Sequence, residues 1–79
     1  MILKYSEARN KASNPDWFDS FYKKDEIASD SEVLQINNLV KIVGEDKLFE
    51  YLEIKEDTII QKEYVQDLID YLEDLKNNM

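Results

Sequence analysis

The segment that most constrains the fold is residues 58–76, TIIQKEYVQDLIDYLEDLK, which has the strongest helical periodicity in the chain. Its apolar residues recur every three or four positions and form one stripe on an α-helix: Val65, Leu68, Ile69, Leu72 and Leu75. Four acids recur with similar spacing and fall within about 60° of one another on the helical wheel: Glu63, Asp67, Asp70 and Asp74. The pattern predicts a helix with one side for a core and, roughly 150° away, a row of carboxylates that we call the acidic ridge.

The chain has 79 residues, and this length limits how much of it can be buried. A single domain fits such a length, and it buries only about 60% of the surface that the unfolded chain exposes. There is no cysteine, so no disulfide supports the fold, which fits a reducing compartment. No apolar run approaches the roughly 18 residues of a membrane span, and the first residues lack the apolar segment of a signal peptide. A cytoplasmic location is therefore expected.

Two short helices are expected in the N-terminal third of the chain. The first is KYSEARNKA, residues 4–12, whose alanines lie at helical spacing. The proline that follows disfavours an α conformation in the residue before it, so the first helix should end there. Asn14 is a good N-cap and Pro15 suits the first helical position, which predicts a second helix at 15–24.

Two more helices are expected on either side of the single glycine. Ser29 and Glu32 have the spacing of a capping box and predict a helix that runs to residue 43. Gly44 stands where such a helix should end, and a helix of about two turns is expected at 45–53. One kinked helix that continues through Gly44 stays open, because a glycine within a helix costs only about 1 kcal/mol.

Residues 51–61 allow two interpretations. Thr58 and Gln61 again have the capping-box spacing, which would start the last helix at Thr58. The β-branched residues of this region favour an extended chain instead, and residues 55–57 could form the turn of a small β-hairpin. A lone two-stranded hairpin is only marginally stable, so helices remain the main expectation.

The predicted fold is therefore all-α, with four or five short helices in a single domain, residues 1–79, and a frayed tail at 77–79. Its core is expected to contain Trp17, Phe21, Val33, Ile36, Leu39, Val40, Leu48, Leu52, Val65, Leu68 and Leu72. Four aromatic residues fall within six positions of the second helix: Trp17, Phe18, Phe21 and Tyr22. One face of a short helix cannot hide all four side chains. The main interpretation is that the cluster belongs to the core, and the alternative is that part of it is an exposed contact for a partner.

Charge is distributed unevenly along the chain. The formal net charge is −8, from 18 acids and 10 bases. Residues 1–24 carry five bases and three acids, a net of +2, whereas residues 25–79 carry fifteen acids and five lysines, a net of −10. This balance argues against nucleic acid or an anionic membrane as a direct ligand, because both are bound by Lys and Arg. It favours a basic protein partner, attracted through long-range electrostatics.

Residue types that carry catalysis or bind metals are scarce. With no histidine and no cysteine, the usual general base, thiol nucleophile and zinc ligands are missing. There is no glycine-rich phosphate loop, and no stretch has the spacing of a calcium-binding EF-hand loop. We expect that the chain is not an enzyme and that it binds no metal ion or cofactor.

The acidic ridge differs from an ordinary solvated helix face. Such faces mix signs, whereas here the neighbours at i+3 and i+4 are other acids, which costs a few tenths of a kcal/mol per pair. A second acidic group precedes the last helix: Glu45, Asp46, Glu50, Glu53, Glu56 and Asp57. We interpret these six acids and the ridge as a surface, spanning residues 45–74, that binds a basic partner. A purely solvated face is the alternative.

In size, acidity and lack of cysteine the chain resembles the small phage anti-restriction and anti-CRISPR proteins. This resemblance is one of size and charge, and it implies an inhibitor that presents a nucleic-acid-like surface to a basic nucleic-acid-binding protein. The alternative function is a small helical adaptor or regulator, or an immunity or antitoxin protein, that binds its partner through the Trp17, Phe18, Phe21 and Tyr22 cluster. Monomer and homodimer both remain open, because the apolar stripe of residues 65–75 is also compatible with a short dimer seam.

Overall fold

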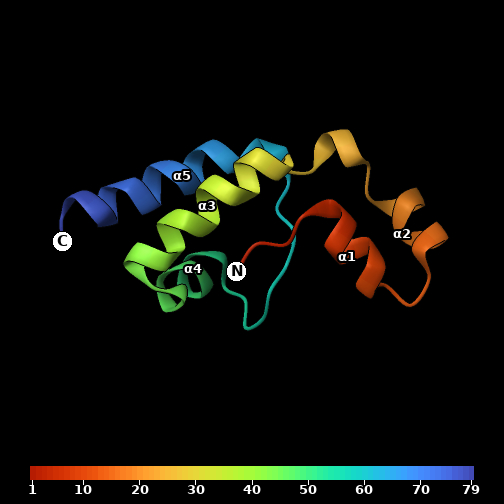
Figure 1. Cartoon of the computed structure of the whole chain (residues 1–79), viewed down its shortest axis with the longest axis horizontal. Coiled ribbons are helices and arrows are strands. Elements are labelled where there is room, and N and C mark those ends of the chain that lie inside the picture. Colours follow the sequence, from red (N-terminus) through yellow and green to blue (C-terminus); the bar gives the residue numbers. More distant parts are fainter.

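A computed structural model describes all of residues 1–79 and has an all-α fold, which confirms the predicted class (Figure 1). The helices are α1 (Tyr5–Lys11), α2 (Pro15–Phe21), α3 (Asp30–Val43), α4 (Glu45–Leu52) and α5 (Lys62–Asn77), with a 3-10 turn, η1 (Lys24–Glu26), between α2 and α3. α2 ends three residues earlier than expected, so its two closing lysines lie outside the helix. None of the helices combines the length and the apolar character needed to cross a bilayer.

The molecule is elongated, 43 × 22 × 18 Å along its principal axes, and has two parts. Helices α3, α4 and α5 form a body at one end, and α1 and α2 form an arm at the other (Figure 1). α3 and α5 pack together and run in the same direction, away from the arm. The chain between α4 and α5, residues 53–61, runs back along the molecule to allow this arrangement, and we call it the return segment.

The core lies mainly between the inner faces of α3 and α5. Ile36 and Val40 on α3, and Leu68 and Leu72 on α5, are completely inaccessible to solvent. Burying each such side chain stabilises the fold by about 1.5–3 kcal/mol. The remaining members of this cluster are Ile2, Ala28, Val33, Leu39, Leu48, Ile60, Val65 and Ile69. The apolar stripe that could have served as a dimer seam is thus largely buried within the chain, against α3.

Local signals place three of the helix ends as expected. The Asn14 side chain accepts a hydrogen bond from the N–H of Trp17 at 3.1 Å, which caps α2. The Ser29 hydroxyl accepts from the N–H of Glu32, and the Glu32 carboxylate accepts from the N–H of Ser29, so the capping box of α3 is formed. Gly44 has a φ of +106°, a conformation that other residues rarely adopt. It therefore ends α3, and α4 is a separate helix.

The expected start of the last helix at Thr58 is wrong, because residues 58–61 are extended and α5 begins after them. The Thr58 carbonyl accepts a hydrogen bond from the N–H of Leu3 at 2.8 Å, and the Ile60 carbonyl accepts one from the N–H of Ala28 at 3.0 Å. These partners are distant in sequence, and they outweigh the local capping signal. The β-hairpin left open for this region does not form, since the extended residues pair with the N-terminal half of the chain instead.

Two aromatic residues expected in the core are exposed, and this part of the core prediction is wrong. Trp17 is 58% exposed and Phe21 is 63% exposed. α2 has only two turns, and its inner side is occupied by Phe18, whose buried ring packs on Tyr5 with ring centroids 5.3 Å apart. Trp17 and Phe21 lie one turn apart beside it, where they stack on each other at 5.1 Å. The buried residues also include three isoleucines that lie outside the expected core positions: Ile2, Ile27 and Ile60.

Candidate functional site

The acidic ridge lies on the outer side of α5, and its four carboxylates are all exposed: Glu63, Asp67, Asp70 and Asp74. The orientation of α5 follows from its apolar stripe, which includes the fully buried Leu68 and Leu72 and packs against α3. Since the acids occupy the opposite side of the helical wheel, the packing that forms the core also turns the ridge toward solvent. The same periodicity thus determines both surfaces of the helix.

The charges of the ridge are not neutralised by the rest of the chain. None of its carboxylates takes part in an ion pair. Asp70 accepts a hydrogen bond from the neutral amide of Gln66 at 2.9 Å, and the nearby Lys62 instead reaches Glu32 of α3 at 4.0 Å. Like charges at i+3 and i+4 repel one another by a few tenths of a kcal/mol per pair. A positively charged partner would relieve this repulsion.

The other six predicted acids are exposed but belong to different elements. Glu45, Asp46 and Glu50 lie on α4, Glu53 is its C-cap, and Glu56 and Asp57 lie on the return segment. By helical geometry Asp46 and Glu50 point away from the fully buried Leu48. The structure therefore divides the ten acids among α5, α4 and the return segment.

Two of these acids are engaged within the chain. The ammonium group of Met1 bonds the carboxylate of Asp57 and lies 3.8 Å from the carboxylate of Glu45. Their negative charge is therefore partly balanced at this position. The unbalanced acidic charge that is most regularly spaced is that of α5.

Three tyrosines border the acidic ridge, and we call them the tyrosine flank. The ring of Tyr51, on α4, stacks on that of Tyr71, on α5, with centroids 4.4 Å apart and planes at 28°. Tyr64 lies seven residues before Tyr71, which puts the two on the same side of α5, about 20° apart around its axis. Tyr64 is 53% exposed and Tyr51 is 44% exposed. The sequence pattern did not single out these residues, although the spacing of Tyr64 and Tyr71 was a signal.

The arm separates the four aromatics that were considered as an alternative contact. Its rings touch in a row, from Tyr5 through Phe18, Tyr22 and Phe21 to Trp17, with successive centroids 4.8–5.3 Å apart. Phe18 is buried and Tyr22 is half-buried, so they support the arm from inside. Only the stacked pair at the exposed end of the row, Trp17 and Phe21, is available to a partner.

An ionic contact holds the two helices of the arm together. Arg9 donates from Nε to both carboxylate oxygens of Asp19, at 2.9 and 3.0 Å, and the Tyr5 hydroxyl donates to the same carboxylate at 2.7 Å. The hydrogen bonds from Tyr5 and then Arg9 hold the pKa of Asp19 below its usual value. The hydrogen bond to Asp19 also raises the pKa of Tyr5 and that of Arg9. The aromatic row is therefore fixed to α1 at its inner end.

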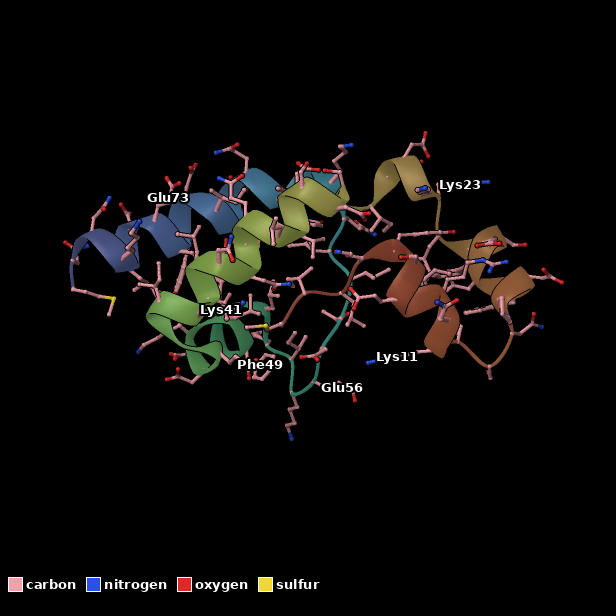
Figure 2. All side chains as sticks on the ribbon, in the orientation of Figure 1. Lys11, Lys23, Lys41, Phe49, Glu56 and Glu73 are labelled. Carbon is pink, nitrogen blue, oxygen red and sulfur yellow. The ribbon has the colours of Figure 1, made fainter.

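A groove of about 650 Å³ separates the arm from the return segment. Its apolar lining includes Leu3, Phe18 and Ile59. Figure 2 shows Lys11 reaching from α1 toward the turn that carries Glu56, and both residues line this groove. The opposite charges on its two sides favour an arm that stays close to the body.

The exposed surfaces of α5 and of the arm are the candidate functional features of the chain. No group of three or more acids in the chain is arranged so that it could hold a metal ion. Comparisons with protein-family models, with curated proteins and with solved structures found no match for this chain.

Proposed function

We propose that this chain is a non-enzymatic inhibitor that binds a basic, nucleic-acid-binding protein through the acidic ridge of α5. The observation that supports this function is a row of four exposed carboxylates, on one side of a single helix, without an ion-pair partner. Successive acids are three or four residues apart, which places them about 4.5–6 Å apart along the helix axis. Such a row of anionic oxygens offers a basic protein charges at intervals similar to those of a nucleic-acid strand.

The chemistry of the partner follows from the same surface. A protein that binds nucleic acid carries a cluster of lysines and arginines for the phosphates, and this cluster would pair with the ridge. The net charge of −8 would also speed the encounter with a basic protein at low salt. An inhibitor of the phage anti-restriction or anti-CRISPR type, acting in the cytoplasm of a bacterium, is the class that best fits this combination of size and charge.

The test compares three versions of the chain immobilised on beads and exposed to a bacterial lysate. They are the wild type, the ridge variant Asp67→Lys/Asp70→Lys/Asp74→Lys, and a matched control with the same net charge, Asp16→Lys/Asp25→Lys/Glu26→Lys. The control reverses three exposed acids of α2 and η1 that are not members of the ridge, although Asp25 and Glu26 lie near Glu63, which both variants keep. Wild type and control should retain the same basic protein at about 0.1 M salt and release it well below 1 M, where the Debye length falls to about 3 Å. The ridge variant should not retain it.

Inhibition is then measured with the purified partner and its own nucleic acid in a gel-shift assay. Wild-type chain should displace the nucleic acid, and the ridge variant, with helicity confirmed by circular dichroism, should not. Retention of the partner by the ridge variant would contradict binding through α5. A partner that stays on its nucleic acid at saturating concentrations of the chain would contradict inhibition.

A second function, an adaptor or an immunity protein that binds through the arm, is favoured by the exposure of Trp17 and Phe21. Exposed, stacked aromatics of this kind are typical of the energetic centre of protein interfaces. In this case the retained partner would survive high-salt washing, because apolar contacts are not screened. Trp17→Ala/Phe21→Ala would abolish its retention, and the ridge variant would retain it.

A further inference from the structure

We propose that the tyrosine flank, Tyr51, Tyr64 and Tyr71, makes the surface of α5 selective for arginine over lysine, so that its partner is an arginine-bearing segment of a basic protein. This inference rests on the proposed function, since it specifies the side chains by which the basic partner binds. The selectivity for arginine is inferred from the tyrosines and from their position beside the carboxylates. The acids alone would attract either cation.

The flank is an aromatic surface on which Tyr51 and Tyr64 are exposed and Tyr71 is half-buried. Tyr51 and Tyr71 stack across the α4–α5 contact, and the outer of these two rings, Tyr51, is 44% exposed. Tyr64 stands alone on α5 and is 53% exposed. None of the three hydroxyl groups donates a hydrogen bond within the chain, so the flank has no internal partner to displace.

Each tyrosine of α5 lies beside a carboxylate of the ridge. Asp67 follows Tyr64 by three residues and Asp74 follows Tyr71 by three residues, and residues three apart are neighbours on a helix surface, with Cβ atoms about 5–6 Å apart. The two tyrosine–aspartate pairs are seven residues apart, so they repeat on one side of α5 at an interval of about 10.5 Å along the axis. The surface therefore presents two tyrosine–aspartate pairs, one with the exposed Tyr64 and one with the half-buried Tyr71, whose ring is stacked on Tyr51.

Such a pair fits a guanidinium group better than an ammonium group. A guanidinium is planar, donates two parallel hydrogen bonds to a carboxylate and stacks its face on an aromatic ring. The ammonium of lysine is a compact, strongly hydrated charge that pairs with the carboxylate but gains little from stacking. Charge complementarity thus identifies the occupant as basic, and the tyrosines specify arginine.

The test measures the binding of two peptides, nona-arginine and nona-lysine, by isothermal titration calorimetry at low salt. Wild-type chain should bind nona-arginine about fivefold to thirtyfold more tightly, as expected for two cation–π contacts, one with Tyr64 and one with the Tyr51–Tyr71 stack. Tyr64→Leu/Tyr71→Leu should reduce this preference toward the small value that carboxylates alone provide, with little change in affinity for nona-lysine. Gln66→Leu is the matched control, because it puts the same side chain on the other side of the ridge. It removes the hydrogen bond to Asp70 but leaves every tyrosine in place, so it should keep the preference.

Two further variants separate the outcomes. Tyr64→Leu alone changes only an exposed residue outside the stacked pair, and it should lose about half of the preference on a logarithmic scale even if the double variant fails to fold. Asp67→Asn/Asp74→Asn should weaken the binding of both peptides. Equal affinity of wild type for both peptides, or a preference that survives the loss of both tyrosines, would overturn the arginine inference and leave the proposed function standing. Absence of binding to either peptide would overturn both.

Discussion

The side chain of Asn37, near the core, forms hydrogen bonds with the backbone of Ile2 like those that a neighbouring β-strand would form. Its amide oxygen accepts from the N–H of Ile2, and its amide nitrogen donates to the Ile2 carbonyl, both at 2.9 Å. Ile2 is only 2% exposed, so these two backbone groups have little access to water. One side chain of α3 therefore provides hydrogen-bond partners for both backbone groups of Ile2 and holds this residue against the body.

Replacing this amide should destabilise the fold out of proportion to its size. Asn37→Ala leaves the N–H and the carbonyl of Ile2 without partners, and we expect it to lower the free energy of unfolding by about 1–3 kcal/mol. Asn38→Ala is the matched control, since the adjacent Asn38 is exposed and its replacement should stay within about 0.5 kcal/mol of wild type. Urea unfolding followed by circular dichroism measures both, and equal effects would show that the paired hydrogen bonds contribute nothing.

The sequence could not predict which aromatic residue of α2 is buried. Trp17 and Phe18 are adjacent, so they differ by about 100° on the helix, and either could face inward. The choice is made by Tyr5 of α1, which packs on Phe18, and by the absence of any element over Trp17. Sequence periodicity over two turns contains neither fact.

Between elements, the contact of α1 with α2 depends on the ionised form of Asp19. The pKa of Asp19 is lower in the folded chain than in the unfolded chain, because Tyr5 and Arg9 donate hydrogen bonds to its carboxylate. Its stabilising contribution is therefore complete above about pH 4, the ordinary pKa of an aspartate, and is lost as pH falls through the lower pKa of the folded state. Near neutral pH this contribution is fully present.

Asp19→Asn should lower the free energy of unfolding relative to wild type. This difference should be largest near neutral pH and should shrink below about pH 4, as measured by urea unfolding from pH 7 to pH 2.5. Asp16→Asn is the control on the same helix, since Asp16 has no ion pair, and its effect at pH 7 should be smaller. Parallel curves for wild type and Asp19→Asn across the whole range would show that the ionic contact does not stabilise the arm.

Element boundaries could be predicted where the deciding atoms are close in sequence. The capping box of Ser29 and Glu32 and the helix end at Gly44 involve neighbouring residues, and both were predicted correctly, although a continuous helix through Gly44 had also been left open. Thr58 has an equally good local signal, yet its carbonyl pairs with Leu3 from the opposite end of the chain. Local residue spacing contains no information about such a long-range partner.

Across the whole molecule, burial is concentrated in the body. α3 and α5 each contribute four buried residues, whereas α1 contributes none and α2 contributes only Phe18. The arm shares few contacts with the body beyond the extended connections and the groove beside the return segment. Its helices therefore have less apolar burial to lose on opening.

Native-state hydrogen exchange should report this division. Amides of α1 and α2 should exchange through openings of lower free energy than those of α3 and α5, because local stability follows buried apolar contact. Exchange measured by NMR over a series of low urea concentrations distinguishes the two groups. Equal exchange free energies in arm and body would show that the molecule opens as one cooperative unit.

Only part of the binding surface could be predicted from the sequence. The acidic ridge belongs to one regular helix, so its composition and outward orientation follow from the periodicity of α5. The tyrosine flank needs Tyr51 from α4, which reaches Tyr71 only because the return segment reverses the chain between the two helices. A surface built from two elements requires the tertiary structure.

The return segment also has a consequence for how the protein is made. Residues 58–72 pair with Leu3 and Ala28 and pack on the inner face of α3, so a nascent chain that ends before residue 58 lacks this part of the core and has only α4 to cover α3. At roughly 5–20 residues per second, synthesis of residues 58–79 takes about 1 to 4 seconds. During that interval the part of α3 that packs on α5 is free to meet a chaperone or a second nascent chain, and it is covered only when the completed last helix packs against it.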